Sequence, residues 1–261
     1  MGVNAPTGPI DAARRALQRE RRQLRDEREA LKAFKERVTE IDTTSPGAGH
    51  QQFPLTGAGS TGLQSVRDAY ADTVMDVPHY ELAYNESLPE HMAGELGEEL
   101  AAAVTGEGGL YPPLKRNLVV TTNEAIRARG EILRLIDDEE ARLDEAEETV
   151  MKMIQQIDSI LDQPIERMEF NSLRLTRTRL LELREQCDDI VDERQAFLER
   201  QRRDLPDPMT GLAEYLYQHC ETTFPLLAVY ARLAEVIDRS VDRAETRLSE
   251  ASRTPRTAKR R

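Results

Sequence analysis

The chain has no tryptophan and two cysteines, and aromatic residues make up 5% of its 261 residues. Bulky globular cores are rich in aromatic side chains, so we expect narrow seams of smaller apolar residues instead. Cys187 and Cys220 lie far apart in the sequence, which argues against a disulfide framework or a thiolate metal site. No apolar run approaches the roughly 18–20 residues of a membrane-spanning helix, and no signal-peptide core stands at the N-terminus. We therefore expect a cytoplasmic protein with no membrane segment.

Lysine is also scarce, because the basic residues are almost all arginine while aspartate and glutamate number 48. Abundant acid, little lysine and an isoelectric point near 5.0 are typical of proteins from a salt-rich cytoplasm, where charge repulsion is screened. We therefore expect a halophilic source. Residues 253–261 carry five basic groups and no acidic group, so we expect a short, disordered basic tail.

A seven-residue apolar repeat marks the first helix, which we expect over residues 10–42. Leu17, Leu24, Leu31 and Val38 form one stripe of this repeat. The companion stripe is apolar at its ends alone: it consists of Ala13, Glu20, Glu27, Phe34 and Ile41. A heptad repeat on a charged background predicts a coiled-coil helix that buries one stripe against other helices. The two glutamates favour packing in a wider bundle, or fraying at the middle of the helix.

Residues 43–62 are rich in Gly, Ser, Thr and Pro and predict a flexible linker. Gly57, Gly59 and Gly62 match the spacing of a dinucleotide-binding fingerprint. That fingerprint needs a preceding strand, which Pro54 and the neighbouring glycines make implausible. We therefore expect no cofactor.

Short helices are expected over residues 63–110, as a small helical cap. Apolar spacing predicts a helix over 63–77 and another over 88–104, and Ser87 with Glu90 forms a capping box for the second. Residues 111–204 then carry two long heptad patterns, separated by a break at Pro164. The break favours an antiparallel hairpin, and a kinked continuous helix is the alternative. Helices follow over 205–252, with the last one starting near Pro225.

These patterns predict an all-α fold: an elongated antiparallel coiled-coil or helical bundle with a small helical cap. Residues 1–9 are expected to be a disordered N-terminus.

Few groups of residues in this sequence match a known catalytic or metal-binding pattern. His91 and Glu95 share one helix face, yet two ligands do not make a metal site. The acidic run 137–148 lacks the glycine-hinged loop of a calcium hand and predicts a solvated helix face. No nucleophile elbow, phosphate loop or catalytic triad is readable. We expect no catalytic residue, no metal and no small-molecule substrate.

The segment 79–84 concentrates aromatic side chains in an aromatic-poor chain. His79, Tyr80 and Tyr84 could form a satellite core that fastens the short helices. They could instead form an interaction surface, because tyrosine is enriched where proteins meet.

The most distinctive part of the sequence is VRDAYADTVMDVPHY (66–80), together with LPEHMAGELGEELAAAV (88–104). With the flanking long helices, it resembles an uncharacterised all-helical family of halophilic archaea, over about residues 10–250. The resemblance implies an all-helical fold and a halophilic source, and it implies no activity.

We interpret the chain as a non-enzymatic, cytoplasmic coiled-coil interaction or scaffold protein, with a protein partner or self-association. The alternative is a nucleic-acid-associated regulator that uses the Arg-rich first helix and the basic tail. Residues 11–42 hold ten basic and eight acidic groups, and this near balance argues against a dedicated DNA-binding face.

Overall fold

The computed structural model describes residues 7–44, 61–161, 163–204 and 211–253. These residues form α-helices and one 3-10 turn, and no strand occurs among them, so the all-α class is confirmed. The helices are α1 (Gly8–Glu40), α2 (Thr61–Ala71), α3 (Tyr80–Ala83), α4 (Leu88–Leu96), α5 (Glu98–Thr105), α6 (Pro112–Ile160), η1 (Ile165–Arg167), α7 (Phe170–Asp204), α8 (Leu212–Tyr217) and α9 (Pro225–Arg253). None of these helices combines the length and the apolar character that crossing a bilayer requires.

The chain divides into two compact units, and α1 and α6 each contribute to both. Unit 1 comprises Met1–Gln18 and Glu139–Arg261, and unit 2 comprises Arg19–Asp138. Unit 2 is therefore inserted in the sequence of unit 1.

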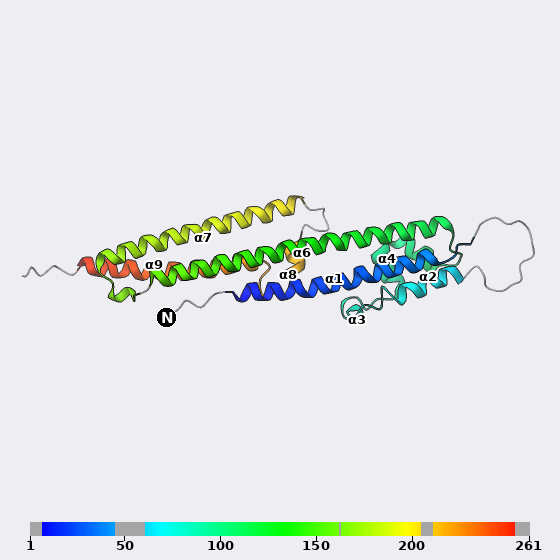
Figure 1. Cartoon of the computed structure of the whole chain (residues 1–261), viewed down its shortest axis with the longest axis horizontal. Coiled ribbons are helices and arrows are strands. Elements are labelled where there is room, and N and C mark those ends of the chain that lie inside the picture. The colour runs from blue at the N-terminus through cyan, green and yellow to red at the C-terminus, as the bar shows by residue number, and fades with distance from the viewer. Residues whose placement is uncertain (1–6, 45–60, 162, 205–210, 254–261) are drawn as a thin grey trace, which may run out of the picture. The chain divides into compact units, whose positions relative to one another are not determined.

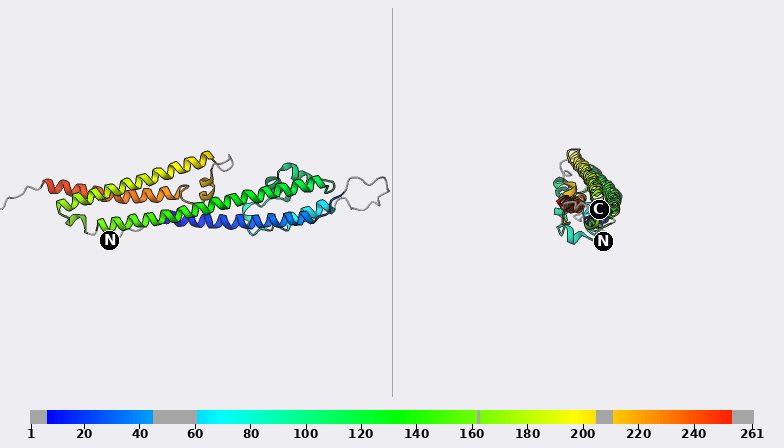
Figure 2. Two further views of the ribbon diagram at one scale, coloured as in Figure 1. Left: turned by 45° about the horizontal axis from the view of Figure 1, so that its top comes forward. Right: turned by 90° about the vertical axis from the view of Figure 1, so that its left-hand side faces the viewer.

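In unit 1, α7 and α9 lie side by side over much of their length (Figures 1 and 2). Arg177 of α7 bonds Glu245 of α9, and Arg184, about two turns later in α7, bonds Asp238, about two turns earlier in α9, so the two helices are antiparallel. Helical spacing in the last helix predicts an apolar stripe of Leu226, Tyr230, Leu233, Ile237, Val241, Ala244 and Leu248. The first six are buried, and Leu248 is partly buried.

The second half of α6 pairs with α7 across the break at Pro164. Arg194 of α7 bonds Glu139 of α6 at 2.6 Å, and the Arg142 guanidinium lies 4.2 Å from the centre of the Phe197 ring. Nearer the break, Gln156 and Gln186 line the same polar groove between the two helices. Residues that are increasingly distant from Pro164 thus meet one another, which is the geometry of a hairpin.

Unit 2 packs four short helices against the second part of α1 and the first half of α6. Its core joins apolar side chains from α1, α2, α4, α5 and α6: Leu31, Phe34, Val38, Val66, Tyr70, Met92, Leu96, Val104, Leu114 and Leu118 are buried there. The C-terminal end of α1 is stabilised by hydrogen bonds from α6. Lys115 Nζ donates to the carbonyls of Thr39 and Ile41 at 2.7 Å, which satisfies the last carbonyl groups of α1 and favours its dipole.

Several predicted boundaries need correction. Helix α1 begins at Gly8, so residues 8–9 are not disordered. Helix α2 ends at Ala71 rather than near 77, and turns connect it to α3. The helix expected over 88–104 is two helices, because Gly97 adopts φ +91°, a left-handed conformation that interrupts the hydrogen-bond ladder. The capping box is confirmed, since Glu90 Oε2 accepts from the Ser87 amide at 3.0 Å and from its hydroxyl at 2.5 Å.

The heptad spacing in the first half of α6 predicts a buried seam of Leu114, Leu118, Thr121, Ala125, Ala128, Ile132 and Leu135. Leu114 and Leu118 are buried, but Ala128 is exposed, and the buried positions further along are Leu133 and Ile136 rather than Ile132 and Leu135. Predictions on residues 1–6, 45–60 (with Pro54, Gly57 and Gly59), 205–210 and 254–261 lie outside the described residues.

Candidate functional site

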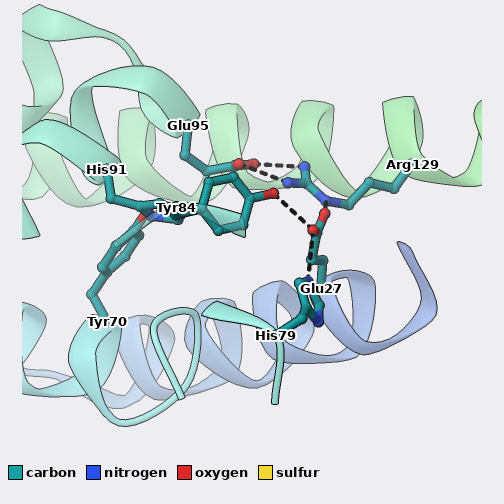
Figure 3. Close-up of polar contacts among 7 residues, drawn as sticks. All are labelled: Glu27, Tyr70, His79, Tyr84, His91, Glu95 and Arg129. Atoms are coloured by element: carbon teal, nitrogen blue, oxygen red, sulfur yellow. Dashed lines mark hydrogen bonds and ion pairs between the residues drawn. The ribbon is translucent and has the colours of Figure 1, made fainter. Parts of the chain in front are cut away.

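A network of charged side chains lies inside unit 2, and we call it the polar node (Figure 3). Its centre is Glu27 of α1. Glu27 Oε1 accepts from His79 Nε2 at 3.0 Å and from the Tyr84 hydroxyl at 2.8 Å, while Oε2 accepts from Arg129 Nε at 2.7 Å. The two nitrogens at the tip of Arg129 donate to the two oxygens of Glu95, each at 2.7 Å. One glutamate and one arginine therefore join α1, the flanks of α3, α4 and α6.

The polar node is largely shielded from water. The side chains of Glu27, Glu95 and Arg129 are 13%, 12% and 14% exposed. Burial alone would raise the pKa of Glu27, but the charge of Arg129 and the hydrogen bonds from His79 and Tyr84 lower it overall. Burial and the neighbouring Glu27 carboxylate both raise the pKa of Tyr84. The Glu27 carboxylate is thus ionised and the Tyr84 phenol is protonated, which is the state that the hydrogen bond between them requires.

Aromatic rings surround His91, next to the polar node. The Tyr70 hydroxyl and His91 Nδ1 are joined by a 2.8 Å hydrogen bond, and the rings of Tyr80 and Tyr84 lie 5.0 and 4.7 Å from the imidazole. Burial lowers the pKa of His91, despite the opposing charges of Glu95 and Glu86. The imidazole is therefore neutral at pH 7 and packs as part of an aromatic cluster.

This arrangement holds groups in place rather than leaving them free to react. Both oxygens of Glu27 and both oxygens of Glu95 already accept strong hydrogen bonds, which fixes their positions. Among the described residues, no three His, Cys, Asp or Glu side chains gather as a metal ion requires. The polar node therefore has a structural role: it holds the 79–84 segment and α4 against α1 and α6.

The three residues predicted as an interaction surface meet within this region. His79 and Tyr80 are buried, and Tyr80 donates to the Glu86 carbonyl at 2.9 Å. Tyr84 keeps about a third of its surface exposed, at 36%, and its neighbour Leu82 is 93% exposed. A partner could therefore reach Tyr84 and Leu82, along with the exposed Glu81 and Ala83, and recognition by this segment stays a prediction.

Sequence reasoning missed the partners of the two seam glutamates. The sequence pattern places Glu27 in the companion stripe of the first helix, and it places Glu139 in the acidic run 137–148, for which a solvated helix face was predicted. In unit 1, Glu139 is 6% exposed and accepts hydrogen bonds from Arg194 at 2.6 Å and from the Tyr217 hydroxyl at 3.1 Å. A glutamate at a buried stripe position is the signal that could have revealed both, because such a charge is kept only when it is paired.

The acidic run 137–148 supplies ion-pair partners to α1. Within unit 1, Arg14 bonds Asp144 and Glu147 at 2.7 Å, and within unit 2 Arg21 bonds Asp137 at 2.6 Å. Arg14 and Arg21, two of the ten basic residues of 11–42, are thus engaged with carboxylates.

A groove in unit 2 lies between α5 and the first turns of α6, and we call it the α5–α6 groove. It encloses about 670 Å³, and Leu96 and Leu114 are its buried floor. Leu100, Tyr111 and Val120 line it, and Val120 and Tyr111 are 54% and 46% exposed. The acidic side chains of Glu98 and Glu99 stand at its α5 border.

Comparison with known proteins identifies a family. Residues 8–241 match the family described as Domain of unknown function (DUF7260), so the chain belongs to this family. No curated protein and no solved structure matches the chain. The expected membership of an uncharacterised family is therefore confirmed, while the halophilic archaeal source stays a prediction.

Proposed function

We propose that this member of the DUF7260 family is a non-enzymatic interaction or scaffold protein of the cytoplasm, which binds a partner protein through the α5–α6 groove. The observation that carries the proposal is the clustering of exposed apolar side chains over a concave surface. Isolated exposed apolar residues are common on any protein, whereas a contiguous apolar patch marks a site of interaction. Tyr111 and Val120 are exposed and line one groove together with Leu100, so they form a small apolar cluster rather than isolated positions.

The energetics of the groove favour binding. Fully burying a valine or leucine side chain contributes about 1.5–3 kcal/mol relative to leaving it in water. Two or three such side chains can supply the core of a modest protein interface, provided that ordering costs are low. The groove therefore offers an apolar centre bordered by charge, which is the usual anatomy of a recognition site.

The polar node keeps those ordering costs low. Arg129 of α6 holds Glu95 of α4 by two hydrogen bonds, and α4 continues through Gly97 into α5. The two walls of the α5–α6 groove are thus joined by a shielded ion pair close to the floor residue Leu96. A surface that is rigid before binding loses less conformational entropy when a partner arrives.

The nucleic-acid alternative gains no support from the described helices. Arg14 and Arg21 of α1 are bound to carboxylates at 2.6–2.7 Å, so contact with phosphate would require breaking these pairs. Binding to a nucleic acid depends on free basic side chains that neutralise phosphates. The interaction proposal is the one that the groove supports.

Capture of partners from native cells, after chemical cross-linking, tests the proposal. Val120→Arg places a charge in the groove, and Leu175→Arg on α7 is a matched control because Leu175 is 53% exposed against 54% for Val120. We expect Val120→Arg to lose a specific set of partners that the parent protein and Leu175→Arg both retain. Retention of every partner by Val120→Arg refutes the groove as the binding site. If both variants lose the same partners, those partners bind nonspecifically, which also refutes the groove as the binding site. Circular dichroism verifies that both variants are folded.

A further inference from the structure

The acidic excess of the chain is concentrated in one stretch. Residues 68–114 contain ten acidic residues and no lysine or arginine, while the other residues contain 38 acidic and 36 basic ones, from totals of 48 and 36. This stretch therefore carries −10 of the net charge of −12. A halophilic composition alone would spread acid over every exposed helix, so the concentration calls for a local explanation.

This acidic stretch builds the wall of the α5–α6 groove. Some of its carboxylates are neutralised within unit 2: Glu95 bonds Arg129, and Asp72 lies 3.6 Å from Arg37. Others are exposed, namely Asp76, Glu81, Glu86, Glu98, Glu99 and Glu107. Glu98 and Glu99 line the groove directly. The apolar surface is thus bordered by negative potential on its α5 side.

We propose that the α5–α6 groove binds a basic amphipathic α-helix of a partner protein. This inference rests on the proposed interaction function and specifies the chemistry of the partner. Leucine-like side chains of the partner would cover Leu100, Tyr111 and Val120, and arginine or lysine would face Glu98 and Glu99. Complementary charge selects the partner and raises its association rate, while the apolar contact supplies most of the affinity.

The dimensions of the groove fit a helix. The eight residues of α5 span about 12 Å at 1.5 Å per residue. Side chains at positions i, i+4 and i+7 of a partner helix span about 10.5 Å and lie on one face. Three consecutive anchors can therefore fill the groove along α5.

Other occupants fit less well. Nucleic acid and anionic membranes are repelled by the −10 stretch. A second copy of this chain would bring another −10 stretch, and the apolar stripe of its arginine-rich α1 is already occupied, because Leu17, Leu24 and Leu31 are at most 5% exposed. A basic helix from a different protein remains the complementary partner.

Binding of a designed peptide to the whole protein, followed by fluorescence anisotropy, tests the proposal. The probe is an amphipathic peptide of about 18 residues with leucines on one face and lysines elsewhere, long enough to hold some helix in water. Its counterpart replaces every lysine by glutamate. We expect the lysine peptide to bind at least about tenfold more tightly than the glutamate peptide, and the difference to shrink as salt is added.

Variants of the groove make the test specific. Val120→Arg should weaken the lysine peptide about tenfold or more, and Glu98→Gln with Glu99→Gln should weaken it about three- to tenfold. Arg116→Gln should strengthen it, because Arg116 is exposed one turn before Val120 and repels a basic ligand. Glu185→Gln with Asp189→Asn, two exposed carboxylates of α7, is the matched control and should leave binding unchanged.

Several outcomes overturn the inference. They are no binding of the lysine peptide, equal binding of both peptides, or equal loss of affinity in the α7 control, which would indicate attraction by overall charge. Dimerisation of the free protein that Val120→Arg abolishes, seen by sedimentation, would identify a second copy as the occupant. If Val120→Arg abolishes capture of a native partner while the lysine peptide does not bind, the interaction function stands and the basic helix is refuted.

Discussion

Removing the arginine of the polar node should destabilise unit 2 strongly. Arg129→Met keeps an unbranched apolar stem that reaches about as far as the arginine Nε, but it deletes the guanidinium group and its charge. Glu95 then loses both hydrogen bonds from the guanidinium, and Glu27 keeps those from His79 and Tyr84. Two carboxylates would face each other across a region from which water is largely excluded.

The expected loss follows from this burial. The side chains of Glu27 and Glu95 are 13% and 12% exposed, so solvent screens their charges poorly. Removing one partner of a buried ion pair typically costs about 3–5 kcal/mol, because an uncompensated charge stays behind. A typical domain is stable by about 5–15 kcal/mol, so this change should consume a large fraction of the stability of unit 2.

Urea unfolding followed by hydrogen exchange measures this loss, because exchange of peptides from residues 19–138 reports unit 2 separately. Arg134→Met is the control on the same helix: Arg134 is 74% exposed and lies 3.9 Å from Glu131, so we expect a change within about 0.5 kcal/mol. Adding Glu95→Gln to Arg129→Met should recover part of the loss, since it removes one stranded charge. Equal stabilities of Arg129→Met and Arg134→Met would refute the reasoning.

Further changes address other parts of the structure. Burial lowers the pKa of His91, so the folded state binds a proton at this residue less readily than the unfolded state does. The free energy of unfolding should therefore decrease as the pH drops below about 6.5. Urea titrations at about pH 7.5 and about pH 5.5 should show a smaller pH dependence in His91→Gln. Gly97→Ala should lower the thermal midpoint, at a cost of about 1–2 kcal/mol, because φ is +91° at this position. Gly94→Ala should raise the thermal midpoint, because the added methyl group meets open space and alanine favours the helical conformation of α4. Tyr217→Phe should cost about 1–2 kcal/mol in urea unfolding of unit 1, because Glu139 loses one of its hydrogen bonds; an unchanged midpoint would show that this bond contributes nothing.

Long helices with regular apolar spacing could be predicted from the sequence, and short ones could not. The stripe of α9 is correct from Leu226 to Ala244, because packing along a single face leaves a clear period in the sequence. The break at Gly97 was missed, since apolar spacing continues through it from Leu96 to Leu100. The spacing of apolar residues indicates which face of a helix is buried, but it does not indicate that one residue, here Gly97, adopts a positive φ angle.

The polar node was beyond prediction from local patterns. Glu27 pairs with residues 52, 57 and 102 positions away along the chain, and no local spacing links these positions. The sequence did single out His79, Tyr84 and His91, because histidine and tyrosine are scarce in this chain, and Glu95, because it shares a helix face with His91. What brings them together is the folding of α3 and α4 onto the long helices, which depends on contacts distant in sequence.

The interleaving of the two units has a consequence for synthesis on the ribosome. Unit 2 is complete once Asp138 has emerged, but the segment before Gln18 belongs to unit 1 and finds its partners only after residue 139. At about 5–20 residues per second, residues 139–147, which carry the Arg14 partners Asp144 and Glu147, follow within about 0.5–2 s. Until then Ile10, Ala13 and Leu17, which are fully buried in the folded protein, lack this part of their packing. The start of α1 is therefore made before unit 2 but packs only after all of unit 2 has been translated, and its apolar stripe is open to a chaperone in the meantime.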